Sequence, residues 1–232
     1  MNLPPVADTP PGFWRRSLAY SLDWLLLAPL LGYLVAPHLL AAWTALRRLN
    51  SLLQDWLLAK MLAAPGVLPS PLGLSHELMQ DAPLLASVNA LATQLSQALT
   101  AALAIAAVTA ALYFIAFEAS DWRATPGKRL LGITVVDLAG QRIGWRRAAA
   151  RFAAGSLNWL SFNLGHALAA WRPDGRALHD LVAGTATVVH TPMPGWARGL
   201  LFAELLLLLG LVAGLLLRLL WLLAQIQEAG LS

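Results

Sequence analysis

The sequence predicts an all-α integral membrane protein with three transmembrane helices, a helical hairpin or fourth span, and a small cytoplasmic β-hairpin module. The 232 residues are 58% hydrophobic and only 12% charged, whereas soluble chains carry roughly 25% charged residues. Mean hydropathy is +0.63. Three apolar stretches reach the ~20 residues that a helix needs to cross a hydrocarbon core ~30 Å thick. The composition excludes a disordered chain and a nucleic-acid-binding tail.

The first apolar stretch covers residues 17–35 and follows Arg15 and Arg16. It is long for the apolar region of a signal peptide, Asp23 interrupts it, and no small-residue cleavage site follows. We therefore expect a retained membrane helix with its N-terminus in the cytoplasm and a bend at Pro29. An acidic group inside a membrane helix costs on the order of 2.5–3.5 kcal/mol. Asp23 should therefore face the protein interior, find a partner or be protonated.

Residues 36–83 form an insertion with two parts. Between Leu39 and Met61, polar and apolar side chains occupy opposite faces of a helix, which we expect on the outer surface of the bilayer or on the bundle. After this helix, Pro65, Pro69, Pro71 and several glycines predict a loop. Amphipathic periodicity encodes no ligand, so an extracytoplasmic cap and a substrate lid both remain open. The polar stripe is Thr44, Arg47, Arg48, Ser51 and Asp55, and the apolar face is Leu39, Trp43, Leu46, Leu49, Leu53 and Trp56.

The second and third spans are predicted over residues 83–117 and 197–223. In the second span, alanines at positions 98, 102, 106 and 110 repeat every four residues. They place small side chains on one stripe, so this stripe is expected to be a packing face. The third span contains Gly210 and Gly214 at the small-xxx-small spacing. That spacing serves dimerisation or close packing within one chain.

The stretch from Phe152 to Trp171 is long enough to span but contains several polar residues. Arginines flank both of its ends, so a full crossing would leave one basic cluster outside, against the positive-inside tendency. We favour a helical hairpin or re-entrant segment bent near Asn163–Gly165 over a fourth span. With that topology, twelve of the sixteen basic residues lie at cytoplasmic boundaries. Five tryptophans fall at the same boundary, where aromatic residues prefer to lie: Trp14, Trp122, Trp145, Trp171 and Trp196.

The sequence predicts no enzyme, no metal site and no cofactor. The chain has no cysteine, and none of its five histidines forms a helical pair at metal-ligand spacing. We find no nucleophile–base arrangement and no glycine-rich cofactor loop. Gly127–Lys128 lacks the first glycine and the following Ser or Thr of a phosphate loop.

Two segments outside the apolar stretches predict a mixture of short helices and strands. Residues 125–137 indicate a turn, a short basic helix and a strand, and Ala139–Gln141 indicates a turn into a second short strand. Residues 178–183 indicate a short helix that Gly184 ends, and residues 185–189 alternate as a strand. The strand at 185–189 can pair with residues 133–136 only if both lie on one side of the membrane.

Three motifs in these regions resemble the RDD family of bacterial membrane proteins, which is named for one arginine and two aspartates. They are Arg16–Asp23, Thr125–Gly132 and Leu178–Thr185. The likeness covers roughly residues 12–189 apart from the insertion at 36–83. It implies an RDD-like membrane domain over residues 1–190 in the bacterial inner membrane, followed by an additional C-terminal transmembrane helix over residues 191–232.

By that likeness, Arg16, Asp23 and Asp180 are the name-giving residues and the core of an ion or substrate site, with Arg15 as an alternative arginine. Arg16 and Asp23 lie on one helix face but about 10 Å apart along the axis. We therefore expect a third group to bridge them or complete the site. Glu118 also matches a family position. The expected supporting residues are Glu118, Lys128, Arg129, Arg176 and His179.

The family likeness implies transport, and cation/proton antiport has been attributed to some members. In this hypothesis Asp23 alternates between protonated and Na⁺-paired states, Arg16 and Asp180 set its affinity, and a homo-oligomer supplies the walls of the pathway. The alternative is a non-catalytic scaffold or accessory subunit whose basic residues bind a partner protein or anionic lipid. Asp23 and Asp180 then hold helices in register. A water-accessible Asp23 favours transport, and a dry, fully paired Asp23 favours the scaffold.

Overall fold

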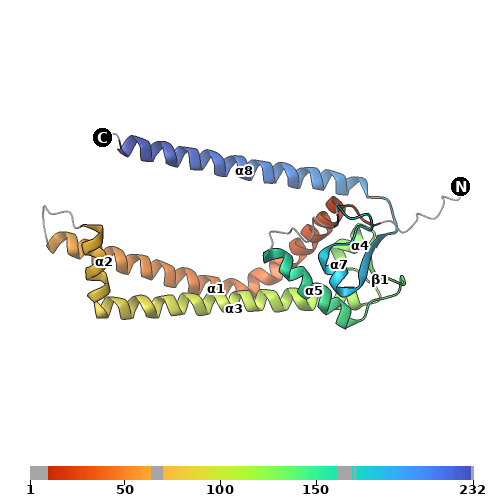
Figure 1. Cartoon of the computed structure of the whole chain (residues 1–232), viewed down its shortest axis with the longest axis horizontal. Helices are drawn as coiled ribbons and strands as arrows, with labels where there is room; N and C mark the ends of the chain where they lie inside the picture. Colours follow the sequence, from red (N-terminus) through yellow and green to blue (C-terminus); the bar gives the residue numbers. More distant parts are fainter. Residues whose placement is uncertain (1–9, 64–69, 161–168, 170, 231–232) are drawn as a thin grey trace. The chain divides into compact units, whose positions relative to one another are not determined.

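The computed structural model describes residues 10–63, 70–160, 169 and 171–230. The chain divides into a first unit, Met1–Leu25 with Tyr113–Ser232, and a second unit, Leu26–Leu112. Two long helices, α1 (Phe13–Ala63) and α3 (Ala82–Ala119), run through both units (Figure 1). The first unit also contains α4 (Pro126–Leu130), β1 (Ile133–Asp137), α5 (Trp145–Leu160), α7 (Leu178–Ala183), β2 (Thr185–Val189) and α8 (Gly195–Gly230).

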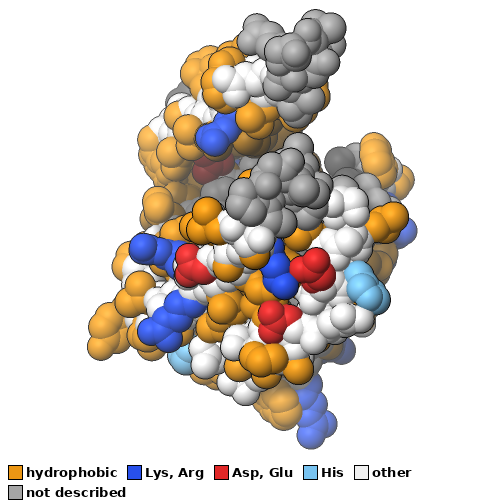
Figure 2. Space-filling view, turned by 90° about the vertical axis from the view of Figure 1, so that its left-hand side faces the viewer, with side chains coloured by type: hydrophobic (Ala, Val, Ile, Leu, Met, Phe, Trp, Pro, Cys, Tyr) orange, Lys and Arg blue, Asp and Glu red, His pale blue; other side chains and the backbone are white. Residues whose placement is uncertain are grey.

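Three helices are long and apolar enough to cross a membrane, namely α1, α3 and α8. This confirms the predicted mostly helical fold with three candidate membrane-spanning helices. In the most apolar part of α8 no residue is buried. Figure 2 shows hydrophobic side chains on one face, interspersed with polar, acidic and basic side chains. Such an apolar surface is unfavourable in water and suits lipid or another membrane helix.

Helix α1 does not end where the first span was expected to end. It continues through Pro29 and Pro37 to Ala63, so the amphipathic helix expected as a separate element is the same helix. No Asp, Glu, Lys or Arg occurs from Trp24 to Leu46. A helix of that length extends about 34 Å, which matches the hydrocarbon core. Asp23 therefore lies at the end of the uncharged run rather than near the centre of a span.

The small sheet pairs β1 with β2 in antiparallel register, with Ile133 opposite Val189 and Asp137 opposite Thr185. The expected pairing of these two segments is confirmed, but the module is not a β-hairpin, because α5 and α7 separate the strands in sequence. The turn at Ala139–Gln141 leads into no second strand. Asp137 Oδ1 accepts hydrogen bonds from the backbone N–H groups of Ala139 (2.9 Å) and Gln141 (2.8 Å), which closes the turn.

The core of the first unit joins the start of α1 to the sheet. Leu18 and Ala19 of α1 cluster with Leu131, Ile133 and Val189, and all five are buried. The short helix α7 ends at Gly184, which adopts the left-handed conformation (φ 62°) that favours glycine at a helix C-terminus. These contacts bring the segment carrying Arg16 and Asp23 against the segments carrying the other two family motifs.

The stretch predicted as a hairpin or fourth span is only partly described. Helix α5 covers its first part up to Leu160. Residues 161–168 and 170, with the expected bend at Asn163–Gly165, lie outside the described residues. The hairpin and its alternative both stay predictions, as does the cytoplasmic location of the sheet.

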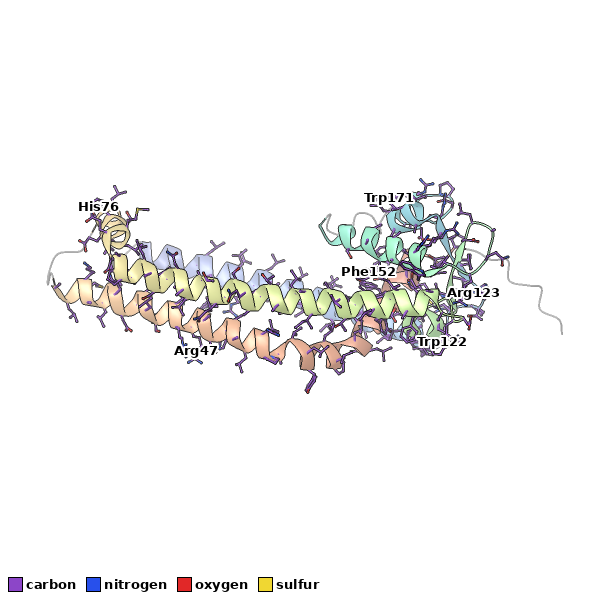
Figure 3. All side chains as sticks on the ribbon, turned by 90° about the horizontal axis from the view of Figure 1, so that it is seen from below. Arg47, His76, Trp122, Arg123, Phe152 and Trp171 are labelled. Carbon is purple, nitrogen blue, oxygen red and sulfur yellow. The ribbon has the colours of Figure 1, made fainter. Side chains whose placement is uncertain are left out.

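In the second unit, α3 runs beside α1, as two views agree (Figures 1 and 3). Helix α2 (Pro71–Gln80) lies in the latter part of the stretch expected as a loop, and Figure 3 labels His76 on it. Residues 64–69 of that stretch lie outside the described residues. Trp56 Nε1 donates to Asp81 Oδ2 (3.0 Å), and Lys60 pairs with Glu77 (2.9 Å). On α3 the predicted packing stripe is buried at Ala98, Ala102 and Ala110 and half-buried at Ala106.

Candidate functional site

Asp23 is completely buried and fully hydrogen-bonded. Its Oδ1 accepts from the Tyr113 hydroxyl (2.8 Å) and from the Gly127 backbone N–H (2.7 Å), and its Oδ2 accepts from Thr125 Oγ1 (2.5 Å). A buried carboxylate is costly unless donors replace its lost hydration. Three donors from α3 and from the start of α4 do so here.

The start of α4 is built to approach α1 closely. Thr125 is the N-cap of α4, and Pro126 occupies the first helical position, where a missing N–H costs nothing. Gly127 then lies directly against α1. A Cβ at Gly127 would collide with the Ala19 carbonyl oxygen and lie 2.8 Å from Asp23 Oδ1. Only glycine allows this approach, which gives the Thr-Pro-Gly motif a physical reason.

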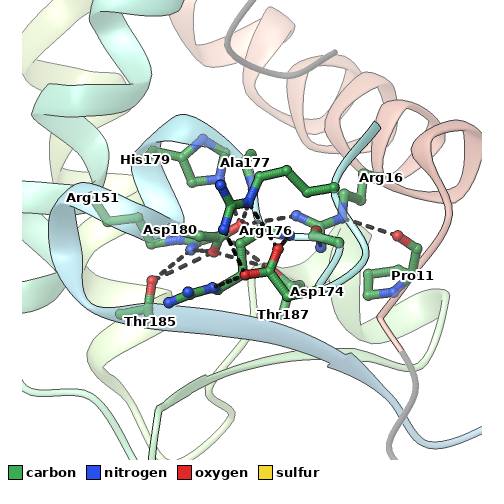
Figure 4. Close-up of polar contacts among 12 residues, drawn as sticks. Pro11, Arg16, Arg151, Asp174, Arg176, Ala177, His179, Asp180, Thr185 and Thr187 are labelled. Atoms are coloured by element: carbon green, nitrogen blue, oxygen red, sulfur yellow. Dashed lines mark hydrogen bonds and ion pairs between the residues drawn. The ribbon is translucent and has the colours of Figure 1, made fainter. Parts of the chain in front are cut away.

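Asp180 forms a second carboxylate centre, on α7 (Figure 4). It is fully buried, and its Oδ2 accepts from Arg16 Nη1 (2.9 Å) and from the Ala177 backbone N–H (3.0 Å). Its Oδ1 accepts from Arg151 Nη1 of α5. Asp180 thus connects α1, α5 and the first turn of its own helix.

Strand β2 supplies two further donors to Asp180. Thr185 and Thr187 point to one face because strand side chains alternate. Their hydroxyls lie 3.4 and 3.2 Å from Asp180 Oδ1. They also accept from Arg151, at 2.9 Å for Thr185 and 3.3 Å for Thr187. One face of the strand therefore holds the ion pair.

All three guanidinium nitrogens of Arg16 donate hydrogen bonds. Besides Asp180, it donates to the Pro11 carbonyl (3.1 Å) and to the Gly175 carbonyl (2.6 Å). It is a structural junction between α1, the segment before it and the loop that leads into α7.

Glu118 extends the network towards α4. Its Oε2 lies 3.0 Å from Arg151 Nε, and its Oε1 pairs with Lys128 Nζ. Lys128 also acts electrostatically on Asp23. Two carboxylates, Glu118 and Asp180, thus pair with three cations, Arg16, Arg151 and Lys128.

The charges of the second centre hold each other in the ionised state. Burial alone would raise the pKa of Asp180, but the charges of Arg151, His179 and Arg16 keep that pKa well below its usual range. Burial would likewise lower the pKa of Arg151, but Asp180 and Glu118 raise it above its usual range. Asp180 therefore stays a carboxylate at neutral pH.

The expected single Arg-Asp-Asp site is in fact two centres. Arg16 and Asp180 form a direct ion pair, whereas Asp23 has its own donors. Among the described residues, no hydrogen bond or ion pair joins Asp23 to Arg16 or Asp180. Among the described residues, no single group hydrogen-bonds to both Arg16 and Asp23, because their separation along α1 directs them to different parts of the module.

Two of the expected supporting residues belong to the network and one lies beside it. Glu118 and Lys128 are members, and His179 Nε2 lies 3.7 Å from Asp180 Oδ2.

Three other basic residues have different partners. Arg176 pairs with Asp174 (2.9 Å), and the Arg129 guanidinium lies 4.5 Å from the centre of the Trp122 ring. Arg15, the alternative arginine, donates to the Leu131 and Thr191 carbonyls, at 2.8 Å to the latter. It therefore secures the end of the sheet instead of replacing Arg16.

Sequence reasoning missed Arg151, Tyr113, Thr125, Thr185 and Thr187 as contributors. The sequence analysis treated Arg151 only as one of the arginines that flank the stretch from Phe152 to Trp171. In the structure it lies on the buried face of α5, with alanines at positions 148 and 154. A charge on an apolar helix face signals a buried partner. The alternation of the two threonines in β2 is a weaker signal of the same kind.

No group of three or more His, Cys, Asp or Glu side chains suited to a metal ion occurs in the described parts of the chain.

Comparison with known proteins agrees with the three motifs. The family model described as the RDD family matches residues 10–184. An uncharacterized protein of Bacillus subtilis (strain 168), YxaI, is 24% identical over 181 residues, which are 78% of this chain and 98% of that relative. No solved structure matches. The match to the family model spans most of the chain and includes Arg16, Asp23 and Asp180, so the chain belongs to the RDD family.

Proposed function

We propose that this RDD protein is a membrane scaffold or accessory subunit, in which the name-giving residues lock the membrane helices to the sheet module. One observation carries the proposal. Every carboxylate oxygen of Asp23 and Asp180 is occupied by protein donors, and neither residue exposes any surface. By the criterion set from the sequence, a dry and fully paired Asp23 favours the scaffold.

Charge balance supports the same reading. A transported cation needs carboxylates whose charge is not already neutralised. Here the buried Glu118 and Asp180 pair with three buried or half-buried cations, and one of these, Lys128, also acts electrostatically on Asp23. A cation binding to Asp180 or Glu118 would have to displace an arginine or the lysine, and leaving such a charge buried without its partner costs about 3–5 kcal/mol.

The two centres together fix the orientation of α1. Arg16 attaches it to α7 through Asp180, and Asp23 attaches it to α4 through Thr125 and Gly127. Two attachments about 10 Å apart along one helix prevent both sliding and rotation. A rigid junction of this kind suits a protein that presents a surface to a partner.

The surface it presents carries arginine–tryptophan pairs. The Arg129 guanidinium stacks 4.5 Å from the Trp122 ring centre, and that of Arg146 lies 5.5 Å from the Trp145 ring centre. Both tryptophans are exposed. Tryptophan prefers headgroup depth, and arginine binds phosphate. We therefore propose that the module lies at the cytoplasmic face of the inner membrane and contacts anionic lipid there.

Proteoliposome flux separates the scaffold from the transporter. With a Na⁺ or pH gradient across the vesicles, the scaffold predicts no proton or cation flux above protein-free vesicles. Asp23→Asn should then lower the thermal stability. The substitution replaces one of the two oxygens that accept hydrogen bonds from Tyr113, Thr125 and Gly127. A flux that Asp23→Asn abolishes while the variant stays folded would support the transporter and overturn the scaffold. Asp121→Asn, in a solvent-exposed ion pair with Arg142, is the matched control.

Lipid binding tests the positive side of the proposal. The double variant Arg129→Glu with Arg146→Glu should reduce binding to vesicles containing phosphatidylglycerol, while binding to neutral phosphatidylcholine vesicles stays unchanged. Lys128 is left unchanged because it pairs with the buried Glu118. Unchanged binding to the anionic vesicles contradicts the proposed lipid contact.

A further inference from the structure

Helix α1 carries two apolar stripes in the second unit, and the described residues of that unit cover only one of them. The covered stripe follows alternating spacings of three and four residues and consists of buried and half-buried side chains, Ala42, Ala45, Leu49, Leu52 and Trp56. This is the stripe expected for a helix that packs along α3. The covered stripe therefore accounts for the packing of α1 within the second unit.

The second stripe is displaced by one residue and is exposed along its whole length. It consists of Leu39, Trp43, Leu46, Asn50, Leu53 and Leu57. Trp43 is 56% exposed and Leu46 is 44% exposed. The uncharged run of α1 ends at Leu46 and is followed by Arg47 and Arg48, so the latter half of the stripe lies beyond the hydrocarbon core. There an apolar stripe is unfavourable unless a protein surface covers it.

The stripe has the pattern of a coiled-coil seam. Successive spacings of four and three residues place Trp43, Asn50 and Leu57 at a positions and Leu46 and Leu53 at d positions. A single asparagine at an a position costs stability and is used to fix register and oligomeric state. Its side chain is satisfied when it meets an identical asparagine on a second helix.

An open surface depression lies on this stripe. It has a volume of about 500 Å³ and is lined by Trp43, Leu46, Arg47, Asn50 and Ser51. The first four of these residues lie at positions i, i+3, i+4 and i+7. In a coiled coil, four side chains with this spacing form the hole into which one side chain of the facing helix, the knob, inserts. In a parallel pair this a-d-e-a hole receives a d residue, which makes Leu46 of a second copy the matching knob.

Membrane insertion fixes the direction of such a pair. Two copies with the same topology hold their α1 helices parallel, so the stripe meets itself in register. The e residue Arg47 then faces the g residue Ala42 of the other copy, and the e residue Gln54 faces the g residue Leu49. The flanks of the seam therefore contain no pair of like charges.

We infer that the exposed stripe of α1 is a homodimer interface, in which a second copy of this chain packs parallel and in register with Asn50 opposite Asn50. The inference goes beyond the proposed function and is independent of it, because a scaffold and a transporter can both be dimeric.

Cysteine crosslinking in native membranes tests the interface, since the chain contains no cysteine of its own. Two differently tagged copies carrying the same single cysteine are co-expressed and oxidised with copper phenanthroline. Asn50→Cys and Leu53→Cys should give a disulfide-linked dimer that contains both tags. Arg48→Cys and Asp55→Cys, at exposed f positions of the same helix, are matched controls and should stay monomeric.

Each other occupant of the stripe gives a different result. If lipid or another helix of the same chain covers it, none of the four variants crosslinks, which overturns the inference. If the chains merely aggregate, all four crosslink equally, which also overturns it. If Asn50→Cys gives a crosslinked product but no product with both tags forms, the partner is a different protein, which contradicts the homodimer.

A charge substitution provides a test that needs no thiol. Asn50→Asp places two like charges opposite each other and should lower the dimer fraction of the purified chain at least tenfold in size-exclusion chromatography with light scattering. Asn89→Asp, the same change at an exposed position of α3, should leave it unchanged. A wild-type chain that is monomeric in both detergent and nanodiscs overturns the inference.

Discussion

Arg151 is the residue on which the buried network depends. Its guanidinium contacts Glu118, Asp180, Thr185 and Thr187, and the side chain is 4% exposed. Arginine suits this role because its planar group offers five donors in a fixed geometry and stays charged. A lysine has three donors on one nitrogen and cannot reach these acceptors together.

Replacing Arg151 by methionine should destabilise the protein by about 3–5 kcal/mol, because Glu118 and Asp180 would remain buried without a shared counter-charge. Unfolding by SDS titration of the protein in mixed micelles measures the change. Arg129→Met, which removes an arginine stacked on the exposed Trp122 ring, should cost less than about 1 kcal/mol. Equal losses for the two variants would contradict a network centred on Arg151.

The Asp180 carboxylate also predicts a pH dependence. Its pKa is held below the usual range in the folded state by Arg151, His179 and Arg16, against the opposing effect of burial. The unfolded chain therefore binds its proton first, so the contribution of Asp180 to stability is complete above about pH 4 and falls as the pH drops below it. Thermal melting from neutral to acidic pH should show this loss, and Asp180→Asn should weaken the dependence. An Asp180→Asn melting curve parallel to that of the wild type would speak against the ion pair.

At this scale the sequence predicted the three name-giving residues and Glu118 because they stand in recognisable motifs. It could not predict that Asp23 and Asp180 occupy separate centres. Tyr113 and Arg151 are distant in sequence from the acids they serve. Their roles arise only when α3 and α5 pack against α1 and α7.

Among the elements, the contact between α4 and α1 depends on a missing side chain. Gly127→Ala should push the start of α4 away, because its Cβ would meet the Ala19 carbonyl and the Asp23 carboxylate. We expect a lower melting temperature and faster proteolysis of the sheet module. Gly155→Ala, at a helical position of α5 with open space around it, should be neutral or stabilising by up to about 1 kcal/mol. A Gly127→Ala variant as stable as the wild type contradicts the close approach.

The elements also show where local patterns suffice. The sequence predicted a strand at 133–136 and another at 185–189, because strand propensity and the alternation at 185–189 are local properties. The first helix was expected to end near Val35, but α1 continues to Ala63. Between Val35 and Ala63 the sequence contains one residue that can stop a helix, Pro37, and α1 continues through it. The turn at Ala139–Gln141 was expected to lead into a strand, but the Asp137 carboxylate closes it instead.

For the whole molecule, helix length exceeds bilayer thickness. Helix α1 has 51 residues, about 77 Å at 1.5 Å per residue, against a hydrocarbon core of ~30 Å. Part of it must therefore extend beyond the bilayer. Composition predicted the membrane class and the three spans because lipid requires apolar surfaces on every helix that contacts it.

The proposed topology makes a labelling prediction. In intact cells, a cysteine at Asp55 should react with a membrane-impermeant maleimide, because Asp55 lies beyond the uncharged run on the extracytoplasmic side. A cysteine at Leu138, which is 68% exposed beside the sheet, should react only after the membrane is permeabilised. Labelling of Leu138→Cys in intact cells would reverse the proposed orientation.

The central claim is that Arg16, Asp23 and Asp180 have a structural role and bind no cation. The most direct test is whether the stability of the protein depends on the cation present. Any cation bound by the folded protein alone raises its melting temperature in proportion to the logarithm of its concentration once the site saturates. The wild-type protein should melt at the same temperature in NaCl, LiCl and KCl as in choline chloride of equal ionic strength. A rise specific to one of these cations that disappears in both Asp23→Asn and Asp180→Asn would contradict this claim and establish an ion site.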